Sequence, residues 1–302
     1  MRNRRGVVVA WIACLCATLL TTPAAWAADP LQSITASPTN ESVSLSAGGT
    51  YDGFVKITNT GQTPYQFIVS ASPFSVTGES YDQSFAARPD LIDASKWFSF
   101  ARTTYSANPR DEIAVAYHIK VPTDIAAGGY YAAIFAEASN TSAGQGVTSH
   151  KRVGVLMYIT VTGDVIKSGK VLGYNLPLIH TQPPLHADVR LQNTGNVHYD
   201  ATTSLVVSDI FGNTKARLES TNTIFPKSTR KLSLTWDKAP SFGLFQVSGT
   251  VKYLDKTEQL PTRYTLMLSA NAFLIIFIAV ILLAAYAYLT RKRRSNVVRR
   301  RR

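Results

Sequence analysis

Cysteine is nearly absent from this chain, and the positions of the two that occur narrow its class. Cys14 and Cys16 both lie in the apolar N-terminal segment. The rest of the chain therefore has no disulfide, although exported domains commonly use them. The same absence excludes a cysteine nucleophile or a cysteine-ligated metal there. Because a eukaryotic receptor ectodomain of this size usually contains disulfides, we interpret the chain as bacterial.

Motifs for catalysis and metal binding are also missing. The sequence has no Gly-x-Ser-x-Gly, no His-Glu-x-x-His and no glycine-rich phosphate loop. Its histidines are scattered, and the spacings of His180, His186 and His198 are not diagnostic of a metal site. We therefore predict that the protein is not an enzyme and uses no cofactor or metal.

Net charge is scarce along most of the chain and concentrated at its two ends. The formal net charge is +12, yet residues 28–265 hold 20 basic and 19 acidic side chains. The remaining basic residues flank apolar segments and do not form a patch on a folded domain. This distribution argues against a nucleic-acid partner and indicates a membrane.

The two apolar segments are interpreted as targeting and anchoring elements. Residues 1–27 have the features of a secretory signal peptide, with arginines before an apolar run and a cleavage site after Ala27. Residues 266–290 are predicted to be a transmembrane helix, because Ala272 to Leu289 has no charge. Residues 291–302 would form a cytoplasmic basic tail, which places the body outside the cell membrane in a single-pass topology. The basic residues assigned to the membrane surface are Arg291, Lys292, Arg293, Arg294, Arg299, Arg300, Arg301 and Arg302.

The periodicity of the body is that of β-strands. Apolar residues recur at every second position in 113–121, 153–161 and 245–253, which puts one face of each strand in a core. Only residues 93–98 favour a helical turn, with Asp93 as its cap. Many short alternating strands separated by turns predict β-sandwiches.

An internal repeat sets the predicted number of domains. Residues 55–62 and 189–196 share the pattern of a strand followed by Asn-Thr-Gly, and Tyr65 and Tyr199 are also in register. We interpret each copy as a hairpin turn with left-handed backbone positions. The predicted fold is all-β, with two tandem immunoglobulin-like β-sandwiches, residues 28–163 distal to the membrane and 164–263 proximal to it, plus the C-terminal transmembrane helix.

The second repeat carries a resemblance to a known family. Residues 193–198, then 209–213, then 226–230 and the closing strand through Tyr253 look like the membrane-proximal immunoglobulin-like domain of bacterial surface proteins. With the signal, the two domains, the span and the basic tail, the layout is similar to the WxL-interacting protein family of Gram-positive cell envelopes. That resemblance implies peptidoglycan binding by the distal domain and scaffolding of other surface proteins. It assigns no ligand-contacting residue.

Aromatic residues gather in the long segment 77–109. Tyr81, Trp97 and Tyr105 are candidates for a sugar-stacking ligand surface, because binding residues favour long loops. Packing in the core is the alternative for the same side chains. The sequence alone leaves both open.

The predicted function is a membrane-anchored bacterial surface protein that engages peptidoglycan or another envelope protein as a binding or scaffold module. The alternative is an assembly factor or chaperone for surface or pilus subunits, which would act by strand exchange. An envelope hydrolase ranks third. An unpaired edge strand in the first domain would favour the assembly factor, and an aromatic groove over residues 77–109 would favour glycan binding.

Overall fold

The computed structural model describes residues 33–139 and 151–299 and is built mostly of β-strands. The coarse prediction of a β fold is confirmed. The predicted strands at 113–121, 153–161 and 245–253 correspond to β9 (Glu112–Lys120), β11 (Arg152–Val161) and β18 (Phe242–Tyr253). The predicted helical turn is the 3-10 helix η1 (Ala94–Trp97), where the Asp93 side chain accepts a hydrogen bond from the Ser95 N–H at 3.1 Å.

The first half of the chain, residues 33–161, forms two sheets that face each other across a core. The four-stranded sheet has the order β1 (Ile34–Ser37), β3 (Thr50–Asn59), β9, β7 (Phe98–Phe100). The five-stranded sheet has the order β2 (Asn40–Leu45), β11, β10 (Gly128–Ser139), β4 (Tyr65–Pro73), β8 (Thr104–Ala107). Alternate residues of each strand point inward, and Val55, Phe67, Ile119 and Ile159 are fully buried between the sheets.

The second half, residues 169–268, repeats this plan. A three-stranded sheet has the order β12 (Gly169–Asn175), β14 (Leu185–Asn193), β17 (Thr229–Trp236). A five-stranded sheet has the order β13 (Ile179–His180), β19 (Lys256–Leu268), β18, β15 (Tyr199–Asp209), β16 (Thr214–Ile224). Leu185, Leu191, Leu205 and Val247 are buried between them. The two halves thus have separate apolar cores.

The Asn-Thr-Gly repeat occupies equivalent places in the two halves, but the hairpin interpretation is wrong. β3 and β4 belong to different sheets, as do β14 and β15, so each copy carries the chain from one sheet to the other. Neither Gly61 nor Gly195 is among the described residues with positive φ. The turn depends instead on a buried asparagine, described next.

Each asparagine satisfies three backbone groups. The Asn59 amide donates to the Thr63 and Ala107 carbonyls at 2.9 and 3.2 Å, and its side-chain oxygen accepts from the Gly61 N–H at 2.9 Å. Asn193 makes the same three bonds, to the Val197 and Ile224 carbonyls at 2.8 and 2.9 Å and from the Gly195 N–H at 2.8 Å. Both side chains are fully buried, so the repeat encodes a crossover fixed by hydrogen bonds.

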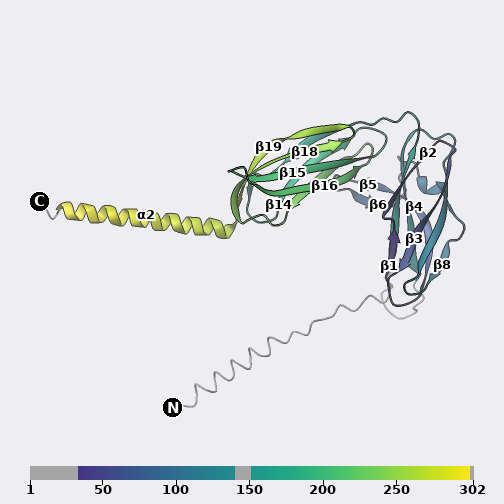
Figure 1. The fold of residues 1–302 in the computed structure, drawn as a ribbon, viewed down its shortest axis with the longest axis horizontal. Coiled ribbons are helices and arrows are strands. Elements are labelled where there is room, and N and C mark those ends of the chain that lie inside the picture. The colour runs from purple at the N-terminus through teal and green to yellow at the C-terminus, as the bar shows by residue number, and fades with distance from the viewer. Residues whose placement is uncertain (1–32, 140–150, 300–302) are drawn as a thin grey trace, which may run out of the picture.

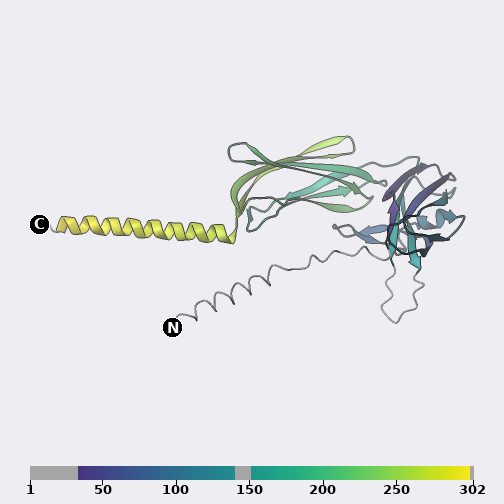
Figure 2. The same ribbon diagram turned by 60° about the horizontal axis from the view of Figure 1, so that its bottom comes forward.

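After β19 the chain continues into α2 (Ala270–Arg299), which extends away from the second half in both views (Figures 1 and 2). Within the part of the chain that the structure describes, no helix has the length and apolar content required to cross a membrane. The prediction of a transmembrane helix at 266–290 is therefore wrong by this measure, and residues 266–268 belong to β19. The predicted cleavage site at Ala27 and residues 300–302 lie outside the described ranges.

The two halves meet at an angle, and the chain bends between them (Figure 1). A short hairpin, β5 (Ser75–Thr77) and β6 (Asp82–Ser84), leaves the first half and lies between the two halves. It belongs to neither sandwich and forms a two-stranded sheet of its own.

Candidate functional site

The three aromatic residues predicted to bind a ligand lie in different surroundings. Trp97 is buried in the first core, with its ring centroid 4.9 Å from that of Tyr130. Tyr105, on β8, stacks on Phe67 at 5.3 Å. Tyr81, on the β5–β6 hairpin, packs against the second half. The structure does not bring the three together, and none of them lines either of the pockets described below.

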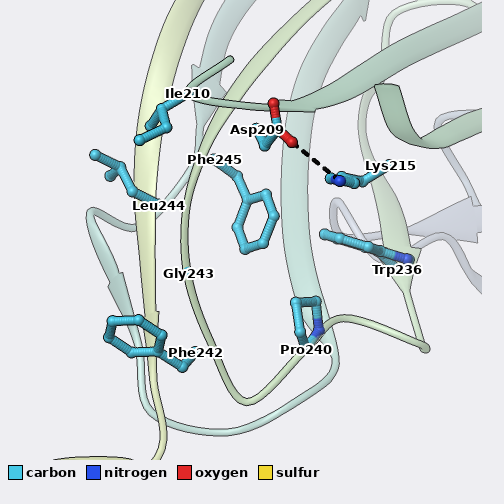
Figure 3. Close-up of a pocket in the computed structure, with 9 residues that line it drawn as sticks. All are labelled: Asp209, Ile210, Lys215, Trp236, Pro240, Phe242, Gly243, Leu244 and Phe245. Carbon is cyan, nitrogen blue, oxygen red and sulfur yellow. Dashed lines mark ion pairs between the residues drawn. The ribbon is translucent and has the colours of Figure 1, made fainter. Parts of the chain in front are cut away.

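A pocket of about 590 Å³ lies in the second half beside the start of α2 (Figure 3). Its walls are mainly apolar, and Trp236 meets Phe245 edge to face at 5.3 Å. Its acid, Asp209, pairs with Lys215 at 3.0 Å and accepts the N–H groups of Phe211 and Asn213. The bonds from Asn213, Lys215 and these two N–H groups hold the pKa of Asp209 well below its usual range. This carboxylate stabilises its own turn and is unsuited to act as a general base near neutral pH.

The three histidines considered for a metal site do not cluster. Among residues 33–139 and 151–299 there is no group of three His, Cys, Asp or Glu side chains that would hold a metal ion. His186 pairs through Nδ1 with the Thr235 hydroxyl at 3.1 Å. His198 pairs with the Tyr131 hydroxyl at the same distance, in the contact between the halves.

The feature best suited to binding is the outer edge of β11. β2 pairs in parallel with β11 only from Leu156 to Val161, and β10 covers the other side. The Leu156 N–H donates outward to the Thr39 carbonyl, whereas the Lys151 carbonyl accepts from Ala138 on the β10 side. Because backbone groups alternate along a strand, the N–H groups of Arg152 and Gly154 point outward like that of Leu156. Within the described chain, no strand pairs with them on that side.

The side chains along this edge leave it accessible. Gly154 has no side chain, and the guanidinium of Arg152 lies 3.3 Å from the centroid of the Phe135 ring. Val153 and Val155 point toward the first core. Arg152 is an exposed charged residue of this edge, but because its guanidinium is turned over Phe135 it does not block strand addition as an outward charge or a proline would.

In the five-stranded sheet of the second half, the edges along β16 and the upstream part of β19 are protected. β13 pairs with β19 only at Leu266 and Met267, so the upstream part of β19 lies along an edge. That part carries Pro261 at a register shift in its pairing with β18, and the exposed charged residues Lys256, Glu258 and Arg263. β16 carries exposed Lys215, Arg217 and Glu219. Proline and charge are the usual means of preventing strand addition.

A third apolar cluster joins the two halves, and we call it the joint: Phe74, Tyr81, Tyr131, Phe135, Tyr158, His198 and Phe225. Phe225, from the second half, lies with its ring centroid 4.7 to 5.8 Å from those of Phe74, Tyr81, Tyr131 and Tyr158, all from the first half. This packing buries an aromatic side chain of one half among residues of the other. A second pocket, about 600 Å³, opens beside it and is lined by both halves.

The β5–β6 hairpin adds polar contacts to the joint. The Phe225 N–H donates to the Tyr81 hydroxyl at 3.1 Å, and Tyr81 also pairs with the Ser228 hydroxyl. At the hairpin tip the Glu79 carbonyl accepts from the Lys231 N–H at 2.9 Å, and the Glu79 carboxylate pairs with Arg190. The Arg190 guanidinium, through its hydrogen bonds, lowers the pKa of Glu79. The hairpin therefore fastens the first half to β14 and β17.

Comparison with known proteins gives structural likeness without sequence likeness. No protein-family model matches the chain, and no curated protein matches it. Solved structures that are similar include the class 5 fimbriae chaperone CfaA, at 8% identity and a TM-score of 0.39, covering 77% of this chain and 99% of that one. The CupB2 chaperone of Pseudomonas aeruginosa has 12% identity and a TM-score of 0.36, covering 76% and 98%. At these values the partners of those proteins are not transferred to this chain.

Several predictions from the sequence are corrected by these findings. The resemblance to the WxL-interacting protein family is wrong, because no family model matches and the similar structures include a class 5 fimbriae chaperone and the E. coli chaperone DraB. The predicted peptidoglycan partner is also wrong, since the similar structures include chaperone complexes with a tip adhesin or a pilin. The single-pass membrane anchor and the cell-membrane location are wrong, because no described helix meets the requirement for a span. The membrane-surface role given to the basic residues from Arg291 onward stays a prediction. The alternative prediction, an assembly factor or chaperone, names the class of protein to which several of these similar structures belong.

Sequence reasoning missed the joint and the open part of β11. β5 and β6 have three residues each, too short for a periodic signal. Alternation located β11 but did not show that β2 would cover only its second part. The aromatic residues Phe74, Tyr131 and Phe225 are visible in the sequence, but nothing in it indicates that they meet.

Proposed function

We propose that this protein is an assembly chaperone for surface or pilus subunits, which holds a partner segment as an added strand on β11. The observation that carries the proposal is the open edge at Arg152 and Gly154, next to valines that enter the first core. An extended segment placed there would accept and donate backbone hydrogen bonds while its alternate side chains extend the sandwich core. The proposal includes no catalytic step and no cofactor.

The arrangement of the chain supports this role. We propose two tandem immunoglobulin-like domains, residues 28–163 and 164–263, with the binding edge on the first. The charges on β16 and β19 and the proline on β19 disfavour strand addition to the five-stranded sheet of the second half, and the joint lets this half hold the first. Tyr81, Trp97 and Tyr105 make contacts in different places and so do not give glycan binding the support that an aromatic groove would.

The test separates backbone pairing from side-chain contact at one position. Arg152→Pro removes the outward N–H at the first residue of the strand, where proline is tolerated. Arg152→Ala removes the same side-chain contact with Phe135 and keeps the N–H. The probe is a fluorescent eight-residue peptide of alternating valine and threonine, and its binding to the full chain is followed by anisotropy. A second peptide, N-methylated at alternate amides, cannot form the ladder.

We expect the unmodified peptide to bind the natural chain and the Arg152→Ala variant with the same affinity. It should bind the Arg152→Pro variant roughly ten-fold more weakly, because a lost hydrogen bond costs about 1 kcal/mol, and more when its partner is left unpaired. The methylated peptide should not bind. Equal binding by the Pro and Ala variants, or no binding of the unmodified peptide, would reject strand addition at this edge.

A further inference from the structure

His198 lies in the joint, between aromatic residues of the first half. Its ring centroid is 5.6 Å from that of Tyr131 on β10 and 5.3 Å from that of Tyr158 on β11. Its own chain position, just before β15, is in the second half. The imidazole therefore forms part of the contact surface by which one half holds the other.

The hydrogen bond between Tyr131 and His198 fits a neutral imidazole. The Tyr131 hydroxyl oxygen and His198 Nδ1 lie 3.1 Å apart. With Nδ1 unprotonated, the Tyr131 O–H donates to it and both groups are satisfied. With Nδ1 protonated, the imidazole donates instead, and the tyrosine proton needs a different acceptor. Protonation therefore adds a charge to this aromatic contact and takes away the acceptor of the Tyr131 proton.

The charged and titratable groups that face this position come from each packed element. The negative charge of Asp200 on β15 favours the protonated imidazole of His198. Arg230 on β17 acts electrostatically on Tyr158 and lies over the Tyr81 ring at 4.5 Å. β10 and β11 contribute Tyr131 and Tyr158, and burial raises the pKa of both phenols, so they stay neutral. Burial outweighs Asp200 and lowers the pKa of His198 below its ordinary value.

We propose that the joint is a pH-operated hinge, in which protonation of His198 loosens the contact between the two halves. The halves have separate cores, so each can stay folded while the contact opens. The neutral imidazole belongs to the closed form, and the charged imidazole is better solvated in the open form. This opening with pH does not require a partner segment to be bound on β11.

The direction of the pH dependence follows from proton uptake. In the open form His198 has a pKa near the ordinary value of about 6.5. In the closed form its pKa is lower, so below about 6.5 the open form binds more protons and is increasingly favoured as the pH falls. The effect is complete once the pH is below the closed-form pKa. Above about 7, His198 contributes no pH dependence.

The experiment measures the shape of the full chain by small-angle X-ray scattering at pH 7.5 and pH 5.0. We expect the radius of gyration and maximum dimension to rise at pH 5.0, with unchanged circular dichroism of the strands. The double variant Tyr131→Phe/His198→Phe keeps aromatic packing and removes both the imidazole of the joint and the hydroxyl that faces it, so its shape should not change. His186→Gln removes an exposed histidine of the second half and should behave like the natural chain.

A second measurement covers the case in which the double variant fails to fold. In the natural chain, the Phe225 amide donates a hydrogen bond to the Tyr81 hydroxyl. Its hydrogen-exchange rate, corrected for the intrinsic pH dependence of exchange, should rise several-fold over the pH range in which NMR shows His198 to become protonated. Unchanged scattering of the natural chain between the two pH values overturns the proposal. So does a shape change that persists in a folded double variant, or Phe225 exchange that does not follow the His198 titration.

Discussion

The two halves of the molecule have the same plan but different edges. Each has two sheets, one buried core and a fully buried asparagine at the crossover between sheets. The first half leaves part of β11 open, with Gly154 and an Arg152 whose guanidinium lies over Phe135. In the second half, Pro261 and charged residues protect the edges along β19 and β16. The comparison teaches that repeated architecture does not imply repeated function, because a few edge residues decide whether a sheet will accept another strand.

The strongest test of the shared plan is removal of the equivalent asparagines. Asn59→Ala and Asn193→Ala each leave two carbonyls and one N–H without their partner in a buried site. We expect each to lower the free energy of unfolding of its own half by about 3 kcal/mol or more. Hydrogen exchange followed by mass spectrometry reads the two halves separately.

Equal losses, each confined to the half that carries the substitution, would confirm that the two crossovers are equivalent. Loss in both halves after either substitution would mean that the joint couples their stability. Thr60→Ala and Thr194→Ala, at exposed neighbouring positions, serve as matched controls and should have small effects.

A smaller effect should distinguish the glycines of β11 and β12. A Cβ added at Gly154 would lie 2.6 Å from a ring carbon of Phe135, so Gly154→Ala forces that buried ring to move. We expect a loss of about 1–3 kcal/mol in chemical denaturation. Gly173, at the bulge of β12, has no atom within 4 Å of the same position, and Gly173→Ala should stay within about 0.5 kcal/mol. A reversed order would show that the glycine in β11 is not required by packing.

The smallest effect is expected from weakening the protection of β19. Pro261→Thr restores a backbone N–H and a strand-forming residue at an exposed edge. We expect weak self-association at high concentration, seen as a concentration-dependent sedimentation coefficient, because the charges on the same strand remain. Thr262→Val, which keeps the proline, should remain monomeric to the same extent as the natural chain. Association by the control alone would show that Pro261 is not what protects this edge.

The sequence predicted those parts of the fold that are encoded by a periodic or repeated pattern of residues. Alternation placed β9, β11 and β18, and the repeat placed equivalent crossovers, because both depend on local patterns. The turn at Asn-Thr-Gly was misinterpreted, since a hairpin and a crossover between sheets use similar residues and differ only in long-range pairing. The sequence could not decide whether Trp97 is buried or binds a ligand, because an aromatic residue beside a short helix has the same sequence context in a core as on a surface.

The candidate site depended on features that have no local signature. Whether Arg152 and Gly154 are covered is decided by where β2 begins to pair, and that start is set by a segment far away in the sequence. The joint likewise combines Phe225 with aromatics from the first half, and no spacing in the sequence relates them. Such juxtapositions follow from tertiary packing alone.

The N-terminal strands have a consequence for the order in which the protein folds. β1 pairs with β3 in one sheet, and β2 pairs with β11 in the other, where Asn40 aligns with Leu156. A ribosome that has released β1 through β10 has therefore not yet supplied the strand that β2 needs. Contacts of such long sequence separation form slowly, because the intervening chain must be ordered first. The first half should close late during synthesis, and until then β2 itself is an unpaired strand that can be bound by other chains.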